Sequence, residues 1–180
     1  MQPCGERLDL HERGRERECA GHDPARCARA QPAQRRGDAG ARDREHDERH
    51  RSRVFDVARA AEAEAAKNNW PVAIAIVDEG GHLVHLAKID NTQYGSIDVA
   101  IQKAQTSAAF KRPTKVFEEA IAGGRNAIIA LKGALPLEGG MPIMHDGKVI
   151  GAIGVSGVKS TEDGQIAKAA VDALPRILGK

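Results

Sequence analysis

Residues that could bind an acidic ligand gather around one predicted junction between two helices. Three cations and two hydroxyls lie there: Lys103, Lys111, Arg112, Thr106 and Thr114. Pro113 ends the first helix, and the start of the second offers free backbone N–H groups to an anion. Arg112 can hold a carboxylate through two parallel hydrogen bonds. The pattern therefore predicts an anion site, and the alternative is that Thr114 is only a helix cap beside a solvated cationic face.

A glycine-rich stretch, residues 135–157, is the second candidate. The backbone N–H groups of Gly139 and Gly140 could bind a phosphate or a carboxylate. The glycine spacing is not GxGxxG and does not open a βαβ unit, which argues against a nucleotide site. Gly151 and Gly154 remove side chains from a strand that is apolar on both faces. This predicts that a helix, a partner subunit or a ligand comes close to that strand.

Histidines and carboxylates give weaker signals. His82 and His85 are three positions apart on a predicted strand, so they point to opposite faces and cannot both ligate one metal within one subunit. Asp78 and Glu138 are possible general bases, although an exposed loop carboxylate is the favoured interpretation of each. The sequence does not allow a Ser-His-Asp arrangement to be ordered.

Hydrophobic periodicity predicts the elements that position these residues. Helices are expected over 54–69, 96–110 and 115–122, and a final helix begins at Ser160 or Thr161 and runs to Leu174. Strands are expected over 72–77, 82–89, 141–145 and 148–155, whereas 126–131 is ambiguous between a strand and a helical turn. Asp146-Gly147 is typical of a two-residue hairpin turn. Paired hairpins between helices indicate an α/β fold with an antiparallel sheet covered by helices.

The N-terminal segment differs from the rest of the chain. Residues 1–53 hold thirteen Arg, eleven Asp or Glu and no Lys, with Leu8 and Leu10 as their only large aliphatic side chains. This composition predicts a disordered tail before one domain at 54–180, and we hypothesise that the tail is an out-of-frame or misassigned translation. Its charges nearly cancel, so no nucleic acid partner is expected. A zinc site is the alternative for the residues Cys19, Cys27, His46 and His50, which lack metal-ligand spacing.

No apolar run reaches the roughly 18–20 residues of a membrane span, so we expect no membrane association and a cytoplasmic protein.

Three long blocks of the domain resemble a known family. They are VAIAIVDEGGHLV, DNTQYGSIDVAIQKAQTSAAFKRPTKVFEEA, and LPLEGGMPIMHDGKVIGAIGVSG followed by DGQIAKAAVDAL, within residues 58–174. They look like the GlcG/HbpS-type haem-binding (haem-degrading) domain. The resemblance implies a profilin-like α/β/α sandwich with a five-stranded antiparallel sheet, and assembly into homo-oligomers. Members of the family are linked to haem binding and breakdown, to glycolate or diol metabolism, and to corrinoid-handling enzymes.

The resemblance also implies haem as a cofactor. A threonine oxygen ligand proposed in related haem binders would correspond to Thr114, and His82, beside the Gly80-Gly81 turn, ranks first as an axial ligand. His85, His145, Tyr94, Met141 and Met144 are the other candidates. Aromatic residues make up only 3% of the chain, so a haem pocket is expected between subunits.

Three functions follow. The first is a haem (tetrapyrrole)-binding protein with slow oxidative haem degradation. The second is an enzyme or accessory protein acting on a small carboxylic or hydroxy acid, with Arg112 and Lys103 as its clamp. The third is a self-assembling structural partner. The sequence leaves open whether the chain is an enzyme.

Overall fold

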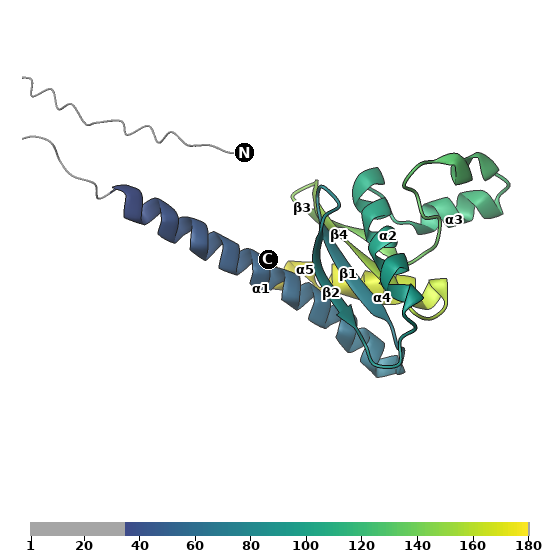
Figure 1. Ribbon diagram of the computed structural model, residues 1–180, viewed down its shortest axis with the longest axis horizontal. Coiled ribbons are helices and arrows are strands. Elements are labelled where there is room, and N and C mark those ends of the chain that lie inside the picture. Colours follow the sequence, from purple (N-terminus) through teal and green to yellow (C-terminus); the bar gives the residue numbers. More distant parts are fainter. Residues whose placement is uncertain (1–34, 180) are drawn as a thin grey trace, which may run out of the picture. The chain divides into compact units, whose positions relative to one another are not determined.

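The computed structural model describes the backbone of residues 35–179 and the side chains of residues 52–179. The fold below is that of the unit Ala41–Lys180 (Figure 1). The first helix, α1, spans Arg35–Asn68 and so begins upstream of its predicted start at Val54. Alanine, arginine and glutamate, which dominate this stretch, are strong helix formers. Residues 1–34, with Cys19 and Cys27, and the side chains of His46 and His50 lie outside the described residues.

The sheet has four antiparallel strands in the order β2-β1-β4-β3. Its strands are β1 (Ala73–Asp78), β2 (Leu83–Lys88), β3 (Gly140–His145) and β4 (Lys148–Ser156). The expectation of five strands is wrong, because the ambiguous segment forms a 3-10 helix, η2 (Asn126–Ala130). Asp146 and Gly147 both have positive φ, at 47° and 76°, which confirms the predicted hairpin turn.

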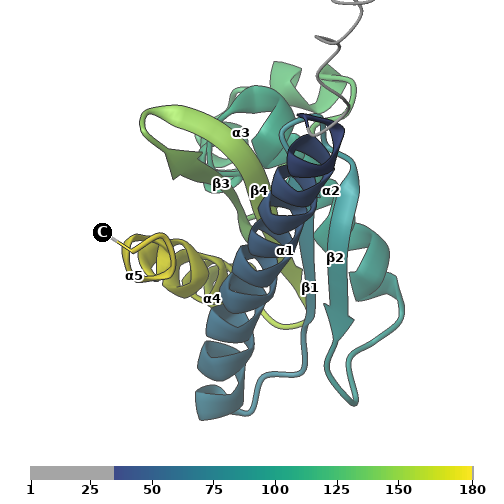
Figure 2. The same ribbon diagram turned by 90° about the vertical axis from the view of Figure 1, so that its left-hand side faces the viewer.

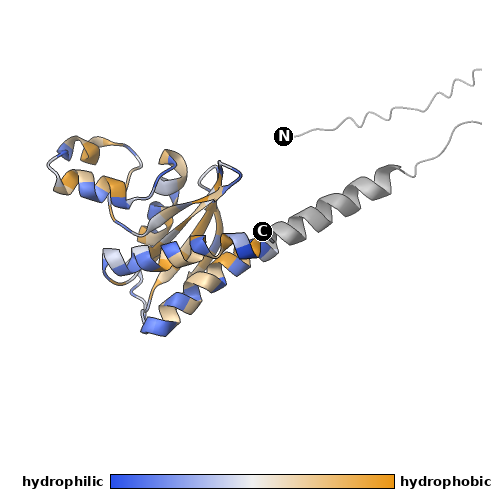
Figure 3. Ribbon diagram, turned by 180° about the vertical axis from the view of Figure 1, so that it is seen from behind, coloured by the Kyte–Doolittle hydropathy of each residue, from blue (hydrophilic) through white to orange (hydrophobic). Residues whose placement is uncertain are grey.

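Helices cover both faces of the sheet. The helices are α2 (Gly95–Phe110), α3 (Lys115–Ala122), α4 (Ser160–Asp172) and α5 (Leu174–Ile177). The main core lies between the sheet and the helices α1 and α4, where Ile74, Ile153 and Ile166 are buried. The helix α2 covers the opposite face (Figure 2), and the sheet between the helices is mainly hydrophobic (Figure 3).

Small residues bring α2 very close to the sheet. Ala100 and Ala104 are fully buried against it. A Cβ added to Gly154 on β4 would lie 2.1 Å from the carbonyl oxygen of Ala100, and one on Gly151 would lie 2.5 Å from that of Val77. The close neighbour of Gly154 is therefore a helix, which is one of the three predicted neighbours. The close neighbour of Gly151 is the adjacent strand β1, which was not among them.

Candidate functional site

The seven predicted ligand-binding residues divide into a buried group and an exposed group. Lys111 and Arg112 are exposed at the turn between α2 and α3. The other five are buried where α2, the start of α3 and the start of β3 meet. We call these five residues the corner cluster: Lys103, Thr106, Thr114, Gly139 and Gly140.

Lys103 forms a buried ion pair. Its side chain is 2% exposed, and its Nζ donates to Asp163 Oδ2 at 2.8 Å and to the Val155 carbonyl oxygen at 3.0 Å. Burial raises the pKa of Asp163, and the ammonium of Lys103 acts in the opposite direction. Lys103 thus joins α2 to α4. The prediction that it clamps a ligand together with Arg112 is not supported, because its charge is already paired.

Thr114 joins the turn between α2 and α3 to β3. Its backbone N–H donates to the Gly140 carbonyl oxygen at 3.0 Å, and its Oγ1 accepts the Gly140 N–H at 2.9 Å. Thr114 is the N-cap residue of α3, as predicted, but its hydroxyl makes no capping hydrogen bond to that helix. Because the side chain is fully buried, its role as an iron ligand stays a prediction that would require the corner to open.

The remaining members of the corner cluster also have internal partners. Thr106 Oγ1 donates to the Gln102 carbonyl oxygen at 2.8 Å and accepts the Leu135 N–H at 2.9 Å. Gly139 has φ of +128°, and a Cβ on it would lie 2.8 Å from Lys103 Nζ. The two glycines therefore permit close packing around the buried ammonium, and the Gly140 N–H is already bonded to Thr114.

His82 is a turn residue with an 83% exposed side chain. Its Nδ1 lies 3.2 Å from Asp78 Oδ2. Asp78 Oδ1 accepts the backbone N–H groups of His82 at 2.9 Å and of Gly80 at 2.8 Å. These bonds, with that from the His82 N–H first, lower the pKa of Asp78. No apolar wall surrounds the imidazole, so the structure does not favour His82 as a haem ligand.

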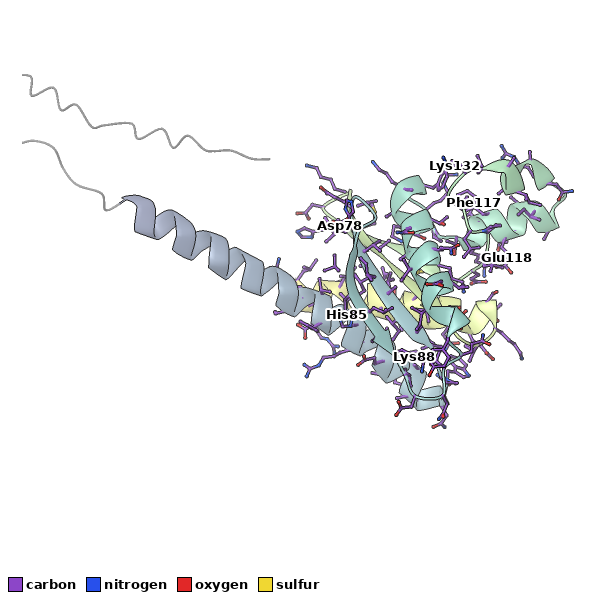
Figure 4. All side chains as sticks on the ribbon, in the orientation of Figure 1. Asp78, His85, Lys88, Phe117, Glu118 and Lys132 are labelled. Atoms are coloured by element: carbon purple, nitrogen blue, oxygen red, sulfur yellow. The ribbon has the colours of Figure 1, made fainter. Side chains whose placement is uncertain are left out.

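The other predicted groups are also placed. His85 lies on β2 and is labelled in Figure 4. Its ring packs edge-on against that of Phe55 on α1, with ring centres 5.2 Å apart. Tyr94 is exposed and lies against the Lys88 ammonium. Glu138 accepts a bond from Lys115 at 3.1 Å, and its N–H donates to the Glu118 carboxylate, which places it in a loop-fixing role rather than in that of a general base.

An apolar hollow of about 90 Å³ opens between α1, α5 and the sheet. We call it the His145 hollow, since His145 on β3 lines it together with Arg53 and Asp78 as its other ionisable residues. The exposed side chains of Val84 (44%) and Ile150 (38%) extend its apolar wall to the surface. The other lining residues are Val54, Val57, Ile76, Val77, Ile143, Gly151, Leu174, Ile177 and Leu178.

A second hollow, of about 230 Å³, lies beside the turn between α2 and α3. We call it the Arg112 hollow. Its lining residues are Phe110, Arg112, Val116, Phe117, Ala120, Arg125, Ile128 and Leu131. Phe110 and Phe117 pack edge-to-face with ring centres 5.2 Å apart. Arg112, one of the two exposed residues of the predicted anion site, therefore lies at this hollow.

Two features are absent from the described part of the chain. No group of three or more His, Cys, Asp or Glu side chains there could hold a metal ion. No helix there is long and apolar enough to cross a membrane.

Comparison with known proteins identifies the family. The model of the family described as "Haem degrading protein HbpS-like" matches residues 50–172. The chain belongs to this family. Protein GlcG of Escherichia coli K12 is 43% identical over 97 residues, which cover 54% of this chain and 72% of that protein. The match to the family model includes residues 50–53, and hence Arg53, which the sequence alone had placed in the tail.

Two solved structures have a similar fold. A double mutant of HbpS from Streptomyces reticuli is 30% identical, with a TM-score of 0.63 over 69% of this chain and 85% of that one. The structure of PduOC in complex with haem is 28% identical, with a TM-score of 0.62 over 67% of this chain and 91% of that one.

Sequence reasoning did not single out three residues of the two hollows as site residues. His145 was named as a haem ligand candidate but not ranked, although its place at the end of a strand before an Asp-Gly turn could have drawn attention to it. Arg125 carried no signal, because its approach to Arg112 depends on how η2 folds back onto α3. Arg53 was lost to the tail.

Proposed function

We propose that the chain binds haem or a closely related tetrapyrrole at the His145 hollow. The observation that carries the proposal is the pairing of an imidazole and a guanidinium with an apolar hollow. Haem needs an apolar slot, commonly a ligand such as histidine, and its propionates are suited to arginine. The family match and the haem complex of PduOC support this choice of ligand.

The fit is good in chemistry and partial in size. His145 would hold the iron, Arg53 would pair with a propionate, and Val84 and Ile150 would contact the face of the ring. The hollow, at about 90 Å³, is smaller than the roughly 300–1,000 Å³ of most ligand sites, so it would take one edge of the macrocycle. A second copy of the chain would then cover the rest, as the predicted homo-oligomer requires.

Bound haem would bring a redox-active iron, which oxidative breakdown of the macrocycle requires. The residues of this chain would act by binding and orientation. The imidazole of His145 would hold the iron, the aliphatic walls would exclude water from one edge of the ring, and Arg53 would orient the ring by binding a propionate.

Haemin titration of the full chain, followed by Soret absorbance, tests the proposal. His145→Gln should weaken binding at least tenfold, equivalent to about 1.4 kcal/mol. His82→Gln is the matched control, because it removes an exposed imidazole and should leave the affinity unchanged. Equal affinity of His145→Gln and the wild type, with unchanged urea unfolding, would overturn the assignment of the site.

A further inference from the structure

We infer that the Arg112 hollow is a separate binding site for a small carboxylic acid with an apolar or aromatic body. The inference does not depend on haem binding, because the two hollows share no lining residue. The shape of the hollow, the charge at its rim and the apolar surface around it support this inference.

The floor of the hollow is apolar and fixed. Phe117 and Ile128 are buried, and the edge-to-face contact of Phe117 with Phe110 sets the orientation of both rings. The volume of about 230 Å³ lies just below the usual range for ligand sites, so a single ring or a short branched chain would fill it.

Two arginines, Arg112 and Arg125, line the hollow. Arg112 is held in place, because its Nε donates to the Phe110 carbonyl oxygen at 3.2 Å and its Cζ lies 5.8 Å from the centre of the Phe117 ring. Its remaining N–H groups can bind a carboxylate in parallel. The backbone of Arg125 is fixed by a bond from its N–H to the Ala120 carbonyl oxygen at 2.9 Å.

The positive charge of this pair is not neutralised within the described residues. Neither Arg112 nor Arg125 forms an ion pair with a carboxylate there. Glu118 on α3, labelled beside Phe117 in Figure 4, uses its carboxylate to accept the Glu138 N–H. Two like charges beside a low-dielectric floor favour an anion between them.

The apolar surroundings select the kind of anion. Val116 and Leu131, which line the hollow, have exposed side chains. A strongly hydrated hydroxy acid such as glycolate would leave this surface in water, whereas an aryl carboxylate would bury it. The geometry thus points to benzoate-like or branched-chain acids rather than to phosphate or glycolate.

The experiment compares benzoate with benzamide, its neutral analogue of the same shape. Isothermal titration of the full chain should give saturable benzoate binding, with benzamide and glycolate each at least tenfold weaker. Arg112→Gln and Arg125→Gln should each weaken benzoate binding at least tenfold. Arg59→Gln, which removes an exposed arginine of α1, is the matched control and should have no effect.

Several outcomes would overturn the inference. They are equal binding of benzoate and benzamide, no saturable benzoate binding, or unchanged binding in both arginine variants. Capture of an acidic peptide in preference to benzoate would also contradict it, since that would make the hollow a protein-docking surface. Benzoate binding should persist in His145→Gln, so a failure of the haem proposal and a failure of this one are distinguishable.

Discussion

The corner cluster and the His145 hollow both contain polar side chains, but these lie in different places. They are buried inside the fold in the corner cluster, whereas they lie at the edge of an open space in the His145 hollow, where His145 Nε2 is 3.4 Å from Asp146 Oδ2. In the corner cluster, Lys103, Thr106 and Thr114 are buried and each has partners inside the chain. In the His145 hollow, an imidazole and a guanidinium line an apolar space that side chains do not fill. Residue types that can bind ligands are therefore not a site when the fold already uses their hydrogen bonds and charge.

The difference follows from position. The corner cluster lies where α2, the start of α3 and the start of β3 meet, and buried polar groups there need partners to offset the loss of water. The His145 hollow lies at the end of the sheet, where a hairpin turn follows β3 and the short α5 leaves the wall incomplete.

The largest expected effect is on the buried ion pair. Lys103→Met leaves Asp163 without its partner at a buried position and should lower the free energy of unfolding by about 3–5 kcal/mol, measured by urea denaturation. The double change Lys103→Met with Asp163→Leu removes both charges and should recover much of this loss. If Lys103→Met retained wild-type stability and instead lost ligand affinity, the corner would be a binding site after all.

A smaller effect separates the two roles of Thr114. Thr114→Val keeps the shape and removes the hydroxyl that accepts the Gly140 N–H, so unfolding should become easier by about 1–3 kcal/mol. Haem affinity, measured by Soret titration, should not change. Loss of haem binding without loss of stability would restore Thr114 as an iron ligand, and Thr114→Ser, which keeps the hydroxyl, should match the wild type in affinity either way.

The smallest effect concerns two carboxyl groups with opposite pKa shifts. Burial raises the pKa of Asp163, so its contribution to stability falls as pH rises through the range between its ordinary and its raised value. Hydrogen bonds lower the pKa of Asp78, so its contribution is present above its ordinary value of about 3.9 and is lost as pH falls through the lowered value. Side-chain carbon NMR titration should place Asp78 below Asp163, and the reverse order would contradict the model of the corner.

Much of the fold follows from local pattern. The two-face apolar strands, the Asp146-Gly147 turn and the break at Pro113 each have a local cause, and the structure has the predicted hairpins. The strand count did not follow, because residues 126–130 are too short and too mixed for periodicity to separate a strand from a helical turn.

The candidate site was less predictable. Sequence placed Lys103 beside the buried stripe of its helix, but its partner Asp163 is sixty positions away and only the packing of α4 brings it close. Packing between separate elements also places Arg53 and His145 in the lining of one hollow, and Arg112 and Arg125 in that of the other. Residue type showed which side chains could bind a ligand. Whether such a side chain binds a ligand or another residue of the chain depends on long-range contacts, which a short sequence motif does not contain.

The contact at Gly154 also restricts how this molecule can move. With main chain resting on main chain, α2 and β4 have no flexible side chains between them to absorb a shift, so they should move as one rigid body. Conformational changes that admit a ligand must then occur in segments outside that body, above all in the stretch from Gly123 to Gly139, which contains η2. Movement of that stretch would control access to the Arg112 hollow, while α2 and β4 keep their relative positions.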